Sequence, residues 1–172
     1  MNRQTIFFIA AVLVQTLILA AVPARRMHTL STGRSVVLQV APVDPYNLLS
    51  GYYVTLDYEI SRAESFPNSA RPQPGETVYA VVEKRADGFW HPVSLEKSLP
   101  PNLPADRAVL RGRMEGWRIV YGIEEFYIPE TKRTVIADDL SKHRNAARVE
   151  VKIDAQGNAA LERLRIEDRV YE

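Results

Sequence analysis

The N-terminal apolar segment constrains this chain more than any other feature. Residues 6–22 read IFFIAAVLVQTLILAAV, in which Gln15 and Thr16 are the only polar side chains. A helix in the core of a soluble protein has a polar face, and this segment has none. Seventeen residues make a helix of roughly 25 Å, the short end of what crosses a bilayer. We therefore expect residues 1–26 to be a membrane anchor whose transmembrane helix covers about 6–22.

Two fates are compatible with such a segment. A signal peptide would be cleaved after Ala24, where Val22, Pro23 and Ala24 approximate the small-residue cleavage pattern. The apolar stretch is longer than the roughly 7–15 residues usual in signal peptides, and Pro23 fits poorly beside a cleavage site. We therefore favour an uncleaved anchor.

The charges that flank the apolar segment bear on its orientation. Arg3 and the amino terminus precede the segment, whereas Arg25 and Arg26 follow it, so the positive charges give opposing signals. No second apolar span follows in the sequence, and residues 27–172 therefore lie on one side of the membrane. We expect a bacterial cytoplasmic (inner) membrane protein with that region outside the cytoplasm.

Composition describes the remainder as an ordinary globular domain and excludes several kinds of site. Hydrophobic residues make up 46% of the chain and charged residues 25%, the proportions of a folded domain. Cysteine is absent, which excludes disulfides, thiolate metal sites and a cysteine nucleophile. Arg3 is the only charged side chain among residues 1–24, so the remainder holds 21 basic and 21 acidic residues. That neutrality argues against a nucleic-acid partner.

Alternating apolar and polar residues predict that the rest of the chain is mainly β. The clearest pattern is GYYVTLDYEI over residues 51–60, which is typical of a half-buried strand. We expect an antiparallel sandwich or barrel-like domain of about seven or eight strands over residues 35–172, after a linker at 27–34. The other predicted strands cover residues 35–41, 77–85, 89–95, 108–114, 117–128, 148–154 and 161–170.

Local residue types predict how these strands begin, bend and end. Asp87 and Gly88 mark a hairpin turn, and Pro92 places the following strand at a sheet edge. Gly122 predicts a bend within the strand over 117–128. The change of phase after Leu161 predicts a bulge at Glu162 and Arg163. One short helix is expected within residues 130–145, where acidic residues come first and basic residues last.

Three stretches of the chain together resemble a known family. Residues 48–58, LLSGYYVTLDY, resemble the sequence for which the GDYXXLXY family of bacterial membrane-anchored proteins is named. Residues 120–130, VYGIEEFYIPE, resemble a second block of that family, and residues 149–166 resemble its closing strand, turn and strand. The resemblance implies a membrane-attached domain of unassigned activity, often found beside multi-pass membrane proteins.

The first block matches at four positions and departs at one. Gly51, Tyr53, Leu56 and Tyr58 match, but Tyr52 stands where the family has aspartate. A catalytic or metal-binding role for that acid would therefore be missing here. Because Leu56 and Tyr58 fall on the expected buried face of a strand, we favour a structural role for the matching residues.

The second block contains the acid of most interest. Glu124 lies on the same strand face as Gly122 and Phe126, so burial of Phe126 would imply burial of Glu124. A buried arginine would be a suitable partner for such an acid. The block residues that we take as candidates for a functional role are Tyr121, Gly122, Glu124, Tyr127, Pro129 and Glu130.

The sequence offers little sign of a metal or cofactor site. His28, His91 and His143 share no metal-ligand spacing, and Asp138 and Asp139 lack a calcium-loop pattern. The phosphate-binding glycine loop and the zinc-protease helix motif are also missing. We therefore expect no cofactor and no metal.

Three functions remain open from the sequence, and catalysis is not favoured. The preferred hypothesis is an accessory or interaction module that the lipid bilayer holds near a partner, possibly a multi-pass membrane protein. The second is a small-ligand-binding envelope domain with an aromatic pocket near Tyr53, Trp90 or Trp117. The third is a membrane-tethered hydrolase that would pair Ser50 with Lys84, although nothing in their spacing selects them.

Overall fold

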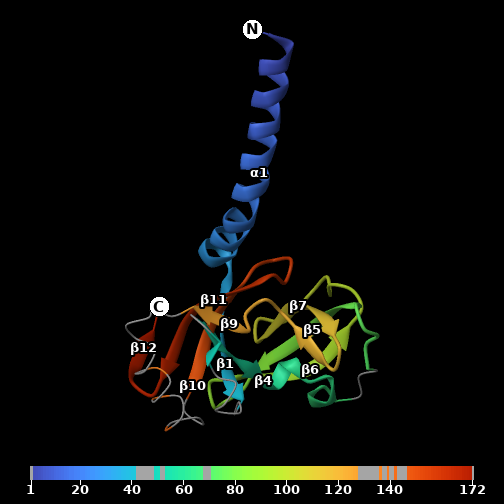
Figure 1. Cartoon of the computed structure of the whole chain (residues 1–172). Coiled ribbons are helices and arrows are strands. Elements are labelled where there is room, and N and C mark those ends of the chain that lie inside the picture. Colours follow the sequence, from blue (N-terminus) through green and yellow to red (C-terminus); the bar gives the residue numbers. More distant parts are fainter. Residues whose placement is uncertain are drawn as a thin grey trace.

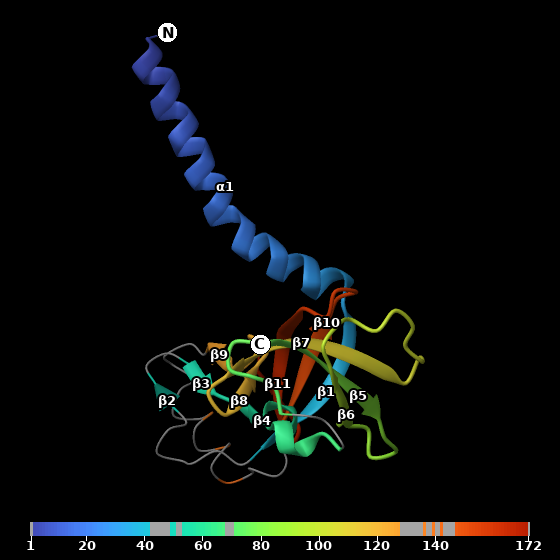
Figure 2. The same ribbon diagram turned by 90° about the vertical axis from the view of Figure 1, so that its right-hand side faces the viewer.

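One long helix projects from a mainly β domain (Figure 1 and Figure 2). The structure, a computed structural model, describes residues 2–41, 49–50, 53–67, 71–127, 136, 139, 142 and 147–171. Strands account for 44% and helix for 28%. The predicted fold class, a mainly β antiparallel domain after one N-terminal helix, is confirmed.

The strands form three antiparallel sheets. Two short 3-10 helices, η1 (Glu59–Ser61) and η2 (Ala63–Ser65), follow strand β4 (Asp57–Tyr58). The five-stranded sheet has the order β12 (Arg169–Tyr171), β11 (Ala159–Ile166), β10 (Ala147–Ile153), β1 (Arg34–Ala41), β4 (Asp57–Tyr58). The three-stranded sheet has the order β2 (Leu49–Ser50), β3 (Tyr53–Thr55), β9 (Glu125–Tyr127). The four-stranded sheet has the order β6 (Trp90–Glu96), β5 (Thr77–Lys84), β7 (Arg107–Glu115), β8 (Arg118–Val120).

Several local predictions are confirmed. β5 and β6 form the expected hairpin, and β6, which contains Pro92, is an edge strand of its sheet. The bulge in β11 is also present, because Arg163 pairs with Glu150 whereas Leu161 pairs with Val151. Glu162 is thus the extra residue.

Three predicted strands are wrong in extent. The strand over 51–60 changes sheets, because β3 pairs with β9 whereas β4 pairs with β1, and η1 follows. The strand over 117–128 is interrupted between β8 and β9, which belong to different sheets. The strand over 161–170 turns back at Glu167, whose φ of 53° permits a tight turn into β12. These three divisions, together with the unpredicted β2, give the described chain twelve strands rather than seven or eight.

The predicted helix within residues 130–145 lies largely outside the described residues. Ile136, Asp139 and Lys142 are described and are helical. Ile136 is fully buried, and Asp139 accepts hydrogen bonds from Arg169 and Tyr171 in β12.

A single hydrophobic core joins the sheets. Val36 and Val149 contribute from the five-stranded sheet, Val54 and Phe126 from the three-stranded sheet, and Leu110 from the four-stranded sheet. All five side chains are buried. Burial of this apolar surface is the main favourable term for folding.

The helix α1 (Arg3–Thr32) is long and apolar enough to cross a membrane. Its most apolar 18-residue window is wholly exposed, with Phe8 and Leu17 as examples. Pro23 lies within the helix, which bends along its length (Figure 2). A proline inside a helix removes one backbone hydrogen bond and is a common cause of such a bend.

The helix continues through most of the segment predicted to be a linker. It ends at Thr32, so only Gly33 separates it from β1. Its last turns contact β10 and β11, and the buried Thr29 hydroxyl donates a 2.9 Å hydrogen bond to Asp154 Oδ2. These tertiary contacts give residues 27–32 packing partners that a sequence pattern does not reveal.

Asp154 receives several hydrogen bonds at this junction. Desolvation alone would raise the pKa of Asp154, but bonds from Asn158, Thr29 and Gln156 outweigh it and lower the pKa below its ordinary value. The backbone amides of Gln156 and Asn158 donate to Oδ1 at 3.0 and 2.9 Å. The carboxylate therefore connects the helix with the β10–β11 turn.

Gly33 allows the helix to approach the sheet closely, and Gly33→Ala should loosen the junction. A Cβ at position 33 would meet the Thr29 carbonyl oxygen and would lie 2.9 Å from the Ile153 amide nitrogen. Overpacking of this kind costs about 1–3 kcal/mol. We expect a lower urea midpoint and faster amide exchange over residues 29–34. Ser31→Ala, an exposed change on the same turns, should leave both unchanged; equal behaviour of the two variants would contradict the prediction.

Candidate functional site

The two family-like blocks lie against each other in the structure. In β3 and β9, Val54 pairs with Phe126 and Thr55 with Glu125. Beyond the paired residues, the Leu56 amide donates to the Glu124 carbonyl oxygen at 2.7 Å. The blocks, separated by more than sixty residues in the sequence, therefore form one structural unit.

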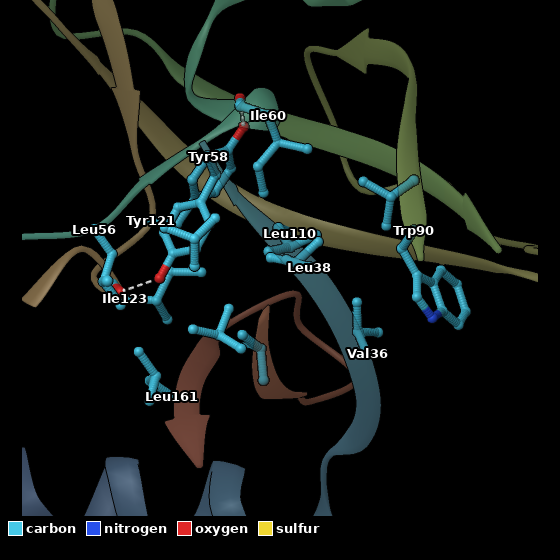
Figure 3. Close-up of a cluster of buried hydrophobic side chains, with 14 of the residues drawn as sticks. Val36, Leu38, Leu56, Tyr58, Ile60, Trp90, Leu110, Tyr121, Ile123 and Leu161 are labelled. Atoms are coloured by element: carbon cyan, nitrogen blue, oxygen red, sulfur yellow. Dashed lines mark hydrogen bonds between the residues drawn. The ribbon is translucent and has the colours of Figure 1, made fainter. Parts of the chain in front are cut away.

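Two buried tyrosines cross-link this unit with their hydroxyl groups (Figure 3). The Tyr58 hydroxyl donates to the Ile123 carbonyl oxygen at 2.7 Å. The Tyr121 hydroxyl donates to the Ile60 carbonyl oxygen, also at 2.7 Å. Tyr58 of the first block thus binds the backbone of the second block. Tyr121 of the second block binds the carbonyl of Ile60, two residues after the end of the first block. We call this pair of bonds the tyrosine crossing.

Burial keeps both hydroxyl groups in their donor form. Desolvation raises the pKa of Tyr58 well above its ordinary value, and the nearby carboxylates of Glu124 and Asp57 raise it further. Desolvation and Glu124 also raise the pKa of Tyr121. Neutral phenols that already donate to backbone carbonyls are suited to holding structure rather than to proton transfer at neutral pH.

Gly112 in β7 makes room for the Tyr121 ring. A Cβ on Gly112 would lie 2.5 Å from Ile119 Cγ2 and 2.8 Å from Tyr121 Cε1. Sequence analysis placed Gly112 in a strand without assigning it this role. The available signal was a glycine in a strand interior, which often marks a close approach of another group.

Glu124 is buried, as the position of Phe126 suggested, with 7% of its surface exposed. Its partners within the described chain are backbone amides rather than an arginine. Oε1 accepts a 2.6 Å hydrogen bond from the Tyr121 amide, and Oε2 accepts a 2.8 Å bond from the Gly122 amide. Gly122 has a φ of +81°, which glycine adopts readily. The carboxylate therefore stabilises the turn that separates β8 from β9.

The remaining candidate residues are distributed differently. Tyr127 is 62% exposed, and its backbone pairs with that of Tyr53. Leu56 is fully buried in the core. Gly51, Pro129 and Glu130 lie outside the described residues. The structure thus brings together Leu56, Tyr58, Tyr121, Gly122 and Glu124, and it pairs the backbones of Tyr53 and Tyr127 in the adjoining sheet.

The described histidines and acids form no metal centre. Among the described residues, no group of three or more such side chains is arranged to hold a metal ion. His91 Nε2 lies 2.8 Å from Asp87 Oδ2, and its Nδ1 lies 3.4 Å from Glu59 Oε2. His143 lies outside the described part of the chain.

The hydrolase pair is not supported by the sheet arrangement. Ser50 lies in β2 of the three-stranded sheet, whereas Lys84 ends β5 of the four-stranded sheet. Lys84 is exposed.

The described structure has no large cavity beside Trp90, and Trp117 is an exposed surface residue. The cavity beside Trp90 measures about 10 Å³, which is at most the space of one water molecule. Trp90 is 5% exposed, and the Arg34 guanidinium stacks 4.7 Å from its ring centre. Trp117 lies on the surface and is 62% exposed.

Comparison with protein families agrees with the block pattern. The model of the family described as GDYXXLXY protein matches residues 15–164. The chain belongs to the GDYXXLXY family. The match includes both blocks, so the tyrosine crossing is a contact within the GDYXXLXY domain. Comparisons with curated proteins and with solved structures gave no match.

Removal of either hydroxyl of the tyrosine crossing should destabilise the GDYXXLXY domain. Tyr58→Phe and Tyr121→Phe each leave a buried carbonyl without its donor, which costs about 1–3 kcal/mol. Urea unfolding of the single variants and the double variant measures this cost and any coupling between the bonds. Tyr127→Phe, at an exposed tyrosine, should change the unfolding free energy by less than about 0.5 kcal/mol. Similar values for all three single variants would show that the buried bonds do not stabilise the domain.

The two adjacent glutamates of the second block provide a matched pair. Glu124→Gln replaces one accepting oxygen by a donor that faces a backbone amide, and should cost about 1–3 kcal/mol. Glu125→Gln changes an exposed side chain and should have little effect. Thermal unfolding followed by circular dichroism measures the difference. A Glu125→Gln variant as unstable as Glu124→Gln would refute the assigned role of the buried carboxylate.

Proposed function

We propose that this GDYXXLXY protein is an accessory or interaction module anchored in a membrane. The uncleaved helix holds the β-domain close to the bilayer, where the domain binds a membrane or envelope partner, most simply a multi-pass membrane protein. The membrane is the bacterial cytoplasmic membrane, and the β-domain lies on its extracytoplasmic side.

The observation that best supports the proposal is the short, hydrogen-bonded junction between helix and domain. α1 continues to Thr32, and only Gly33 precedes β1. Thr29 is bound to Asp154, and the last helical turns contact β10 and β11. A helix connected in this way fixes the position of the domain relative to the membrane. Such an arrangement suits a protein that presents one surface to a neighbour in the same membrane.

The interior role of the family blocks gives further support. Tyr58 and Tyr121 donate to backbone carbonyls, and the Glu124 carboxylate accepts from backbone amides. These groups are occupied in holding the domain together. Trp117 and Tyr127 are the most exposed large aromatic side chains in the described part of the β-domain. Exposed aromatic residues are frequent contributors to protein interfaces.

The small cavity at Trp90 makes an aromatic ligand pocket at that residue less favoured. A site for a small organic molecule usually encloses about 300–1,000 Å³, far more than the space beside Trp90. Partner binding needs no such cavity, because proteins associate through surface area.

Crosslinking in intact cells tests the proposal. The full chain with its anchor, purified after crosslinking, should reproducibly enrich one membrane or envelope protein. Trp117→Ser and Tyr127→Ser test whether the exposed aromatic side chains take part, and at least one should reduce the captured amount several-fold. Both are surface changes expected to leave stability nearly unaltered.

A variant with a damaged domain separates capture by the domain from capture by the anchor. Tyr58→Ala removes a fully buried aromatic ring and should cost about 3–5 kcal/mol, while residues 1–32 are unchanged. Capture should be lost in this variant. Equal capture by wild type and Tyr58→Ala would show that the β-domain does not select the partner, and a lack of any enriched protein would also reject the proposal.

A further inference from the structure

A cleft of about 750 Å³ lies between the last turns of α1 and the β10–β11 turn, with Arg111 of β7 in its wall. Arg25 and Arg26 line it from the helix, and Asp154 and Asn158 line it from the turn. The cleft therefore joins basic side chains from two elements that are far apart in the sequence. We call it the junction cleft.

The positive charge of the junction cleft is only partly balanced. Arg25, Arg26 and Arg111 make no ion pair with the described residues. Asp154 is the one acidic side chain of the lining. Its Oδ2 accepts from the Thr29 hydroxyl at 2.9 Å, and its Oδ1 accepts from two backbone amides of the turn. Three arginines and a single acid that is already hydrogen-bonded thus line the cleft, which leaves an excess of positive charge.

The junction cleft lies where the apolar part of the helix ends. Val22 is the last residue of the apolar stretch, and Arg25 follows three residues later, or about 4.5 Å along a helix axis. In Figure 2 the last turns of α1 run close above the β-domain. If the apolar stretch crosses the bilayer, this place is level with the lipid headgroups.

We propose that the junction cleft binds the phosphate headgroup of an anionic phospholipid from the leaflet next to the β-domain. Guanidinium groups match phosphate oxygens with paired, charge-assisted hydrogen bonds. The acyl chains would remain in the bilayer beside the apolar part of α1. The inference rests on the proposed function, because it requires that the anchor is retained in the membrane.

Position favours a lipid over a soluble anion. A soluble phosphate could reach any exposed basic cluster, whereas Arg25 and Arg26 of this cleft directly follow the apolar stretch of the candidate membrane span. Each arginine close to an anionic membrane strengthens attraction by about fivefold. A bound headgroup would also connect α1 with β7 and so add to the contact between Thr29 and Asp154.

Lipid binding to the full chain in a neutral detergent tests the inference. Native mass spectrometry counts bound phosphatidylglycerol and bound phosphatidylcholine at equal concentrations. We expect a clear preference for phosphatidylglycerol, and Arg111→Gln should weaken its binding several-fold, because a charge-assisted hydrogen bond to the phosphate is lost. Arg26→Gln is a second variant, on the helix, and should give a similar loss. Arg113→Gln is the matched control, because Arg113 lies two residues further along β7 and outside the lining.

Several results would overturn the assignment. Equal binding of the two lipids, or equal losses in Arg111→Gln and Arg113→Gln, would remove the junction cleft as a headgroup site. Displacement of the lipid by glycerol 3-phosphate at equal concentration would show that the cleft binds a soluble anion instead. The same spectra report the mass of the chain. An intact chain without lipid preference rejects only this inference, whereas a chain from cell membranes that lacks residues 1–24 rejects the proposed function as well.

Discussion

The tyrosine crossing is the interaction on which the rest of the β-domain depends. Tyr58 and Tyr121 come from the two family blocks. The hydroxyl of each tyrosine donates to a backbone carbonyl of the other segment, Ile123 for Tyr58 and Ile60 for Tyr121. Buried carbonyl groups are costly when unpaired. The two segments therefore stabilise each other when they pack together. Their contact determines where the three-stranded sheet ends and where β4 pairs with β1.

The crossing also explains why the chain changes sheets at Leu56. The Leu56 amide binds the Glu124 carbonyl oxygen, which extends the contact with the second block by one residue. After this point the backbone pairs with Val40 and Ala41 of β1. Glu124 stabilises the corresponding break in the second block, between β8 and β9. Its carboxylate binds the backbone amides of two residues in the turn before β9. Both breaks are therefore properties of one packed unit.

Sequence patterns predicted burial in this region better than connectivity. Alternation placed Tyr52, Val54, Leu56, Tyr58 and Ile60 on one strand face. Tyr52 lies outside the described residues, and the other four are buried. Alternation could not locate the break at Leu56. When a chain passes from one sheet to another and its side chains continue to alternate between two faces, the sequence pattern does not change. The partners of Glu124 were equally hidden. Backbone amides occur at every residue, so a carboxylate that binds them leaves no second side chain to recognise in the sequence.

The junction between helix and domain was hidden for a different reason. Thr29 and Asp154 are 125 residues apart, and neither residue type indicates a long-range contact. Apolar character ended near residue 22, so residues 27–34 were assigned to a linker, although tertiary packing extends the helix to Thr32. This extension has a mechanical consequence. A flexible linker would let the domain rotate relative to the helix, whereas a helix that ends one residue before β1 and is bound at Asp154 restricts that rotation. If the helix is retained in a membrane, as proposed, the same contacts determine the orientation of the domain as well as its proximity to the bilayer.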